Sequence, residues 1–130
     1  MNIISLIQSI PDYIGGSGVL KTDIEDCEKE LDVVFATDYK QYLEEIGLAC
    51  FDGKELTGIC NSERLNVVNV TYEERSKKPT ISKSWYVIEQ TNFDGIVVWQ
   101  DNTGKVYQLG QNCKIQHIYD SLYDYIEKCR

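Results

Sequence analysis

Acidic residues are the candidate functional residues of this sequence, because they are numerous and closely spaced. Six carboxylates fall between residues 22 and 32, against a single lysine, Lys29. Three more follow at residues 44, 45 and 52. The nine candidate partner-binding residues are Asp23, Glu25, Asp26, Glu28, Glu30, Asp32, Glu44, Glu45 and Asp52.

Two carboxylates perform acid–base catalysis when they converge on one proton. Adjacent residues on a helix project about 100° apart, so Glu44 and Glu45 cannot share a proton unaided, and neither can Glu73 and Glu74. A dense set of carboxylates can instead attract a cationic partner and imitate a phosphate backbone. A solvated helix face is the alternative interpretation of the same residues.

Other chemistry has little support in the sequence. His117 is the only histidine, and the five cysteines contain no C-x-x-C pair, which argues against zinc. The glycine-rich residues 15–18 lack the phosphate-loop pattern and are interpreted as a linker. The turns at residues 52–53 and 101–104 are too short for a calcium loop. The sequence therefore predicts no enzyme, no metal and no cofactor, and a structural role for His117.

The net charge indicates what kind of partner to expect. The chain has a net charge of −8, and all of it lies in residues 1–60, which contain 12 acidic and 4 basic side chains. Residues 61–130 contain 9 of each. Nucleic acid and anionic membranes would be repelled by such a surface. A basic protein would be attracted. The sequence does not predict whether the chain also self-associates.

Composition places the chain in a reducing compartment. An odd number of scattered cysteines suits reduced thiols, which are commonly buried. The apolar start lacks a basic leader, and no run of roughly 18 apolar residues is present. We therefore expect a soluble, cytoplasmic protein of one domain over residues 1–130, a length at which one core suffices.

Periodicity predicts three helices in the first part of the chain. Apolar residues at i, i+3, i+4 and i+7 indicate a helix over residues 3–10. Thr22 and Glu25 form a capping-box pattern that begins a second helix, reaching Asp32. Thr37 is the expected cap of a third helix, which Gly47 ends in the left-handed conformation.

The second part predicts a sheet with helices around it. Asp52-Gly53 is a favoured two-residue hairpin turn, and residues 66–77 can form a helix. Three antiparallel strands are expected over residues 85–91, 96–101 and 106–109, and alternation over 115–118 places His117 on the same side as Ile115. An amphipathic helix around residues 122–129, capped by Asp120 or Ser121, ends the chain. The prediction is an α+β fold, with a meander and a hairpin packed against N- and C-terminal helices.

Several of these segments resemble the SUKH superfamily, which includes bacterial immunity proteins and yeast cell-wall-assembly regulators. The resemblance rests on EL at residues 30–31, DYKQYL at 38–43 before Gly47, LTGI at 56–59, GKVY at 104–107 and SLYDYI at 121–126. The sequence has Phe-Ala-Thr at 35–37 where the family usually has Leu-Pro, and Asp32 where glycine is frequent. These departures leave the subfamily open.

The resemblance implies an immunity protein that binds and neutralises a cognate polymorphic toxin, often a nuclease, inside the producing cell. The acidic first half is independently consistent with a basic toxin. The alternative is a non-enzymatic scaffold or adaptor in a protein complex, like the cell-wall-assembly regulators.

Overall fold

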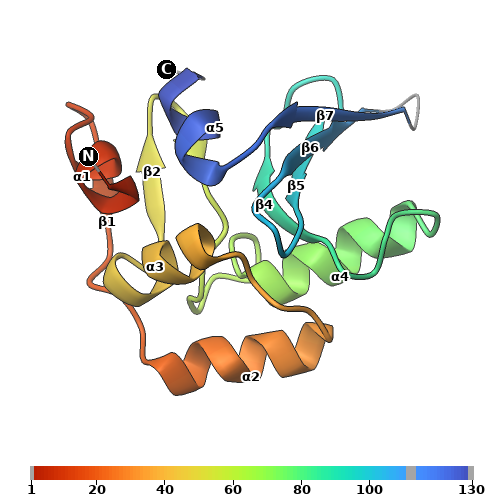
Figure 1. Cartoon of the computed structure of the whole chain (residues 1–130), viewed down its shortest axis with the longest axis horizontal. Helices are drawn as coiled ribbons and strands as arrows, with labels where there is room; N and C mark the ends of the chain where they lie inside the picture. Colours follow the sequence, from red (N-terminus) through yellow and green to blue (C-terminus); the bar gives the residue numbers. More distant parts are fainter. Residues whose placement is uncertain (1, 111–113, 129–130) are drawn as a thin grey trace.

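The computed structural model describes residues 2–110 and 114–128 (Figure 1). Helices and strands are mixed along the chain, and both sheets are antiparallel, so the predicted α+β class is confirmed. The elements are α1 (Ile3–Gln8), β1 (Ile14–Gly15), α2 (Lys21–Leu31), α3 (Thr37–Glu45), β2 (Ala49–Phe51), β3 (Lys54–Glu55), α4 (Val67–Lys77), β4 (Tyr86–Gln90), β5 (Val97–Gln100), β6 (Val106–Leu109), β7 (Ile115–Tyr119) and α5 (Leu122–Lys128).

The strands form two sheets that meet along one line. The small sheet has the order β1-β2-β3, and the large one β4-β5-β6-β7. Just after β3, Leu56 bridges to Glu89 of β4, and the Thr57 N–H donates to the Ile88 carbonyl at 2.9 Å. The two sheets are therefore one sharply bent layer. Helices α1, α3 and α5 pack together beside the small sheet, and α4 packs on β4. Helix α2 lies on the outside, against α3 and α4 (Figure 1).

Two hydrophobic clusters fill the faces of this layer. The larger joins α1, α3 and α5 to side chains such as Tyr86 and Val98 of the large sheet. The smaller lies under α4 and includes Val87 and Trp99. In the larger cluster, Phe35 packs edge-on against the ring of Tyr86 with centroids 4.7 Å apart. Such aromatic pairs add about 1 kcal/mol each beyond the area they bury.

Thr57 holds the junction of the two sheets to α3. Its side chain is buried, and its hydroxyl donates to the Val87 carbonyl at 2.8 Å. Because that bond uses its only proton, the Tyr39 hydroxyl must be the donor in its 2.8 Å bond to Thr57 Oγ1. The Tyr42 hydroxyl donates to the Thr57 carbonyl at 2.9 Å. Two tyrosines of α3 thus bind a residue at the junction of the sheets.

The predicted helix caps are wrong in detail. α2 begins at Lys21, so Thr22 lies inside it, and it is Asp23 that accepts a hydrogen bond from the Leu20 N–H at 3.2 Å. Thr37 is the first helical residue of α3, and Ala36 stands at the cap, where its N–H donates to the distant Tyr86 hydroxyl at 2.8 Å. The bond to Asp23 is local and the bond to Tyr86 is tertiary, and neither uses the threonine side chain that the pattern predicted as the cap.

The hairpin and meander of the prediction lack two of the observed strands, β7 and β1, and the interpretation of residues 15–18 as a linker was wrong. Residues 115–119 form β7, a fourth strand of the large sheet. The glycine-rich segment joins the small sheet: β1 pairs with β2, and the Gly18 N–H donates to Ile46 O at 3.0 Å. Gly18 has a φ of +92°, and a Cβ there would lie 2.0 Å from the Glu44 carbonyl oxygen. Only glycine permits this close approach.

Several other local predictions are confirmed, and the helix expected over residues 66–77 is observed from Val67 to Lys77. Asp52 and Gly53 both have positive φ, 51° and 73°, as a type I′ turn requires. Asn66 caps α4 by accepting from the Val68 N–H at 3.0 Å. The Ser121 hydroxyl oxygen accepts from the Asp124 N–H at 3.0 Å and begins α5. The predicted apolar position at residue 129 lies outside the described residues.

Replacing Thr57 tests the junction. Thr57→Val keeps the shape but removes the acceptor for Tyr39 and the donor for Val87, so we expect the free energy of unfolding to fall by about 2 kcal/mol. Thr57→Ser keeps the hydroxyl and should cost about half as much or less. Urea denaturation followed by tryptophan fluorescence measures both. An unchanged free energy of unfolding in Thr57→Val would mean that these side-chain hydrogen bonds do not stabilise the junction.

Candidate partner-binding surface

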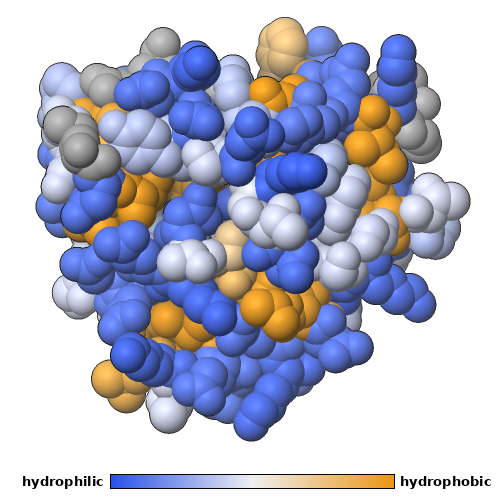
Figure 2. Space-filling model, in the orientation of Figure 1, coloured by the Kyte–Doolittle hydropathy of each residue, from blue (hydrophilic) through white to orange (hydrophobic). Residues whose placement is uncertain are grey.

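The acidic helix α2 lies on the outside of the molecule and is held there by a few apolar contacts. Ile24 and Leu31 are its buried residues, and Cys27 is partly buried between them. These three share one side of the helix, at i, i+3 and i+7. The surface over α2, at the bottom of Figure 2, is mostly hydrophilic, and the other apolar side chains in that view form separate patches. The helix therefore presents most of its carboxylates to solvent.

α4 fixes the C-terminal end of α2. The Arg75 guanidinium donates to Leu31 O at 3.3 Å and also to Lys83 O at 2.7 Å and Trp85 O at 3.3 Å. The Tyr72 hydroxyl donates to Glu30 O. Carbonyls at the end of a helix lack partners within it, and a cation there is favourable. α2 is thus a firmly positioned helix and not a loose flap.

One flank of α2 faces α3 across a groove of about 400 Å³. Glu25 and Glu28 of α2 and Glu44 of α3 line it, together with Lys21 and Lys40. Glu28 is committed to the fold: its side chain is 16% exposed, it accepts from the Phe35 N–H at 2.8 Å, and it pairs with Lys40 at 3.4 Å. The two lysines reduce the negative charge of this groove.

The other flank, the acidic flank, carries Asp23, Asp26 and Glu30, at i, i+3 and i+7. Their combined field is felt by Cys27: burial raises the pKa of its thiol, and Asp23, Asp26, Glu30 and Glu28 raise it further. A thiol resists ionisation next to uncompensated negative charge. The negative potential of this flank is therefore strong enough to shift the pKa of a neighbouring side chain.

Of the four remaining candidate partner-binding residues, three lie near α2 and α3 and one lies elsewhere. Glu44 and Glu45 lie in the last turn of α3, where the helix dipole disfavours negative charge, so they do not serve helix stability. Asp32 follows α2 in the left-handed conformation, with φ of 55°. Asp52 stands apart, in the turn after β2, which points away from α2 in Figure 1. The structure thus gathers eight of the nine candidates on α2, its C-cap and α3.

A separate cleft of about 410 Å³ opens where Asp52 lies. The turn between β2 and β3, the large sheet and α5 enclose it, and Glu89 of β4 lines it. Glu89 is only 2% exposed, and its carboxylate accepts a hydrogen bond from the Tyr125 hydroxyl. Sequence reasoning missed Glu89, although a charged residue inside the apolar run YVIEQ was a usable signal.

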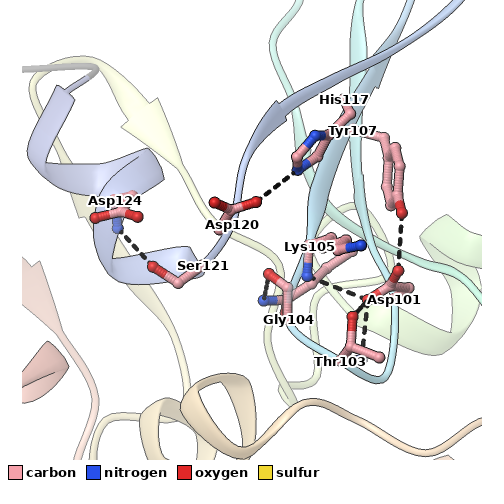
Figure 3. Close-up of polar contacts among 10 residues, drawn as sticks. Asp101, Thr103, Gly104, Lys105, Tyr107, His117, Asp120, Ser121 and Asp124 are labelled. Carbon is pink, nitrogen blue, oxygen red and sulfur yellow. Dashed lines mark hydrogen bonds and ion pairs between the residues drawn. The ribbon is translucent and has the colours of Figure 1, made fainter.

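The polar cluster around Asp101 organises the turn between β5 and β6 (Figure 3). Its carboxylate accepts from the Thr103 hydroxyl at 2.6 Å and from the Tyr107 hydroxyl at 2.9 Å. Burial raises the pKa of Asp101, but these bonds and two backbone N–H donors outweigh it, and the pKa lies below its ordinary value. Burial and Asp101 together raise the pKa of Tyr107 to about 12.

His117 belongs to the same region and contacts two of its neighbours. Its Nε2 lies 3.0 Å from Asp120, and its ring centroid is 5.5 Å from that of Tyr107 on the neighbouring strand (Figure 3). His117 and Ile115 pair with alternate residues of β6, which puts them on the same face as predicted. Among the residues that the structure describes, no group of three or more histidine, cysteine or acidic side chains could hold a metal.

The bent antiparallel layer, with terminal helices packed beside it, defines an α+β domain of the SUKH type. The family model SUKH_5, described as SMI1-KNR4 cell-wall, matches residues 1–129, and the chain belongs to this family. Members of the family are generally non-enzymatic. None of the curated proteins matches the chain. In the described ranges, no helix has the length and apolar character needed to cross a bilayer.

Cys27 can report the field of the acidic flank. Asp26→Asn with Glu30→Gln removes two of the charges that raise its pKa, so more thiolate should form at pH 8 and alkylation by iodoacetamide should quicken by about two- to threefold. Peptide mass spectrometry separates Cys27 from the other cysteines. Glu63→Gln with Glu127→Gln is the matched control, and an equal rate in both double variants would show that the flank exerts no such field.

Proposed function

We propose that this protein is an immunity protein that binds a cognate toxin, of the nuclease class, and neutralises it inside the producing cell. The observation that carries the proposal is the acidic surface formed by α2 and the end of α3, on a domain whose family generally lacks enzymes. SUKH domains fit immunity roles or roles like those of the SMI1-KNR4 proteins. The acidic surface favours the first.

The physical reason lies in the surface that a nuclease must have. A nuclease binds a polyanion through basic side chains, and an exposed array of carboxylates complements them. Asp23, Asp26 and Glu30 project from a helix whose C-terminal end is anchored by Arg75, so the array keeps one geometry. A stable complex would bury roughly 1,600 Å² and cover the toxin's nucleic-acid site.

A non-enzymatic scaffold is the second candidate. The observation in its favour is the family description itself, SMI1-KNR4 cell-wall. A scaffold would use several surfaces for several partners, whereas an immunity protein needs one tight interface. Partner number and salt dependence therefore separate the two functions.

An affinity pull-down from the native lysate, at low and moderate salt with mass spectrometry of the retained proteins, tests the proposal. One basic protein in stoichiometric amount, partly released as salt rises, supports immunity. That protein should cut nucleic acid when isolated and stop doing so when this chain is added. Several housekeeping proteins, or a retained protein whose activity is not inhibited, would contradict the proposal.

Charge reversal on the acidic flank tests whether it attracts the partner electrostatically. Asp26→Lys with Glu30→Lys should slow association with the recovered partner about tenfold and flatten its salt dependence, because attraction becomes repulsion. Glu28 is left unchanged because it holds Phe35 and Lys40. Stopped-flow fluorescence gives the rate constants. Glu63→Lys with Glu127→Lys changes the net charge equally elsewhere. An equal change of the association rate in both pairs would show that the acidic flank does not attract the partner specifically.

A further inference from the structure

The cleft beside Asp52 combines a buried carboxylate with apolar walls. Its lining includes Glu89 and Tyr125, which are almost fully buried, and Phe93, which is 67% exposed. Ile96 of the large sheet and Ile118 of β7 also line it. A volume of about 410 Å³ is within the range of protein sites that take a ligand or an anchoring side chain.

A β-bulge turns Glu89 into this cleft. Val87 pairs with Trp99, but Glu89 pairs with the next residue, Val98, so Ile88 is the extra residue of β4. Without the bulge, Glu89 would lie on the same face as Val87, under α4. Because the register shifts, it lies with Val98 on the other face, toward Tyr125. Bulges that redirect a side chain are common next to functional sites.

The burial of Glu89 is not balanced by a cation among residues 2–110 and 114–128, which the structure describes. The Tyr125 hydroxyl binds one carboxylate oxygen. Lys54 lines the cleft, but within the described residues no lysine, arginine or histidine lies within 4.0 Å of the Glu89 carboxylate. A buried carboxylate is costly unless it is paired and hydrogen-bonded. The cleft therefore complements a positively charged group.

We propose that this cleft receives an arginine side chain of the protein partner, which rests on the proposed function as a binding protein. The guanidinium would donate to Glu89, and Asp52 adds negative charge at the cleft. The stem of the arginine would pack on Ile96 and Ile118, and the guanidinium plane suits the faces of Phe93 and Tyr119. Arginine is preferred to lysine because its guanidinium is more weakly hydrated and is the usual choice for buried ion pairs.

This site differs from the acidic flank in what it does for binding. Exposed carboxylates act mainly on the rate of association, because solvent and salt screen them. A desolvated arginine–carboxylate pair with aromatic walls has the features of an interface hot spot and acts on dissociation. The two surfaces can therefore be tested independently.

A blocked Gly-Arg-Gly peptide is the probe, with blocked Gly-citrulline-Gly as its neutral isostere. ¹H–¹⁵N NMR titration of the protein should show shifts confined to the amides of the cleft with the arginine peptide. The citrulline peptide should bind roughly tenfold or more weakly, since its urea lacks the charge and replaces one donor group with a carbonyl oxygen. Equal binding of the two peptides, shifts elsewhere, or no binding at the highest soluble concentration would overturn the proposal.

Two variants connect the binding to the cleft. Glu89→Gln keeps the hydrogen bond from Tyr125 and removes the charge, so arginine-peptide binding should weaken roughly tenfold while citrulline binding is unchanged. Phe93→Ser removes an exposed wall, without risk to the core, and should weaken both peptides. Glu63→Gln is the control that should bind like the parent. Undiminished binding of the arginine peptide to Glu89→Gln, with the fold verified by its thermal transition, would contradict the proposal.

These outcomes are independent of the toxin. If the peptide binds as expected but the pull-down recovers no toxin, the proposed function fails and the arginine site stands. If a toxin is recovered and neutralised, but Glu89→Gln leaves both its dissociation rate and peptide binding unchanged, the arginine site fails and the proposed function stands.

Discussion

The hydrogen bond from the Thr57 N–H to the Ile88 carbonyl is the contact on which the arrangement of this protein depends. It joins the small sheet to the large one at the bulge of β4, so the two form one bent layer. Tyr39 and Tyr42 bind the same threonine and set α3 against the bend. Burial raises the pKa of both tyrosines well above its usual value, so their hydroxyls remain donors at any physiological pH. The bend places the β2–β3 turn opposite α5, and the cleft lies between them.

Asp38 makes the second long-range connection, from α3 to the end of the chain. One of its oxygens accepts from the Leu122 N–H at 2.8 Å, at the start of α5, and the other from Gln100 Nε2 at 3.1 Å. Burial raises the pKa of Asp38 in spite of these bonds. The folded protein thus tolerates a partly desolvated carboxylate in order to fix α5, and α5 in turn carries the Tyr125 hydroxyl to Glu89. Contacts outside the cleft therefore determine its geometry.

Periodicity and turn chemistry predicted most of the elements because those signals are local. The spacing of Tyr39, Tyr42 and Leu43 predicted α3, and Asp52-Gly53 predicted the turn that its two positive φ angles confirm. The caps at Thr22 and Thr37 were wrong because α2 begins at Lys21 and α3 at Thr37, so each threonine lies within the first turn of its helix. β1 was missed because the glycines that permit its approach to β2 also look like a linker. The face on which Glu89 lies depends on a bulge, and strand alternation cannot show a one-residue shift of register.

The acidic residues of this chain fall into two kinds that act over different distances. The carboxylates of α2 stand in water, where charges are screened beyond roughly 8 Å at physiological ionic strength, so they can guide a basic protein but hold it weakly. Glu89 is shielded from that screening, and its interaction with a cation is correspondingly stronger. Under the proposed function, α2 would govern how fast a partner arrives and Glu89 how long it stays. A net charge of −8 in the first half cannot reveal this division, because Glu89 lies in the half that is neutral overall.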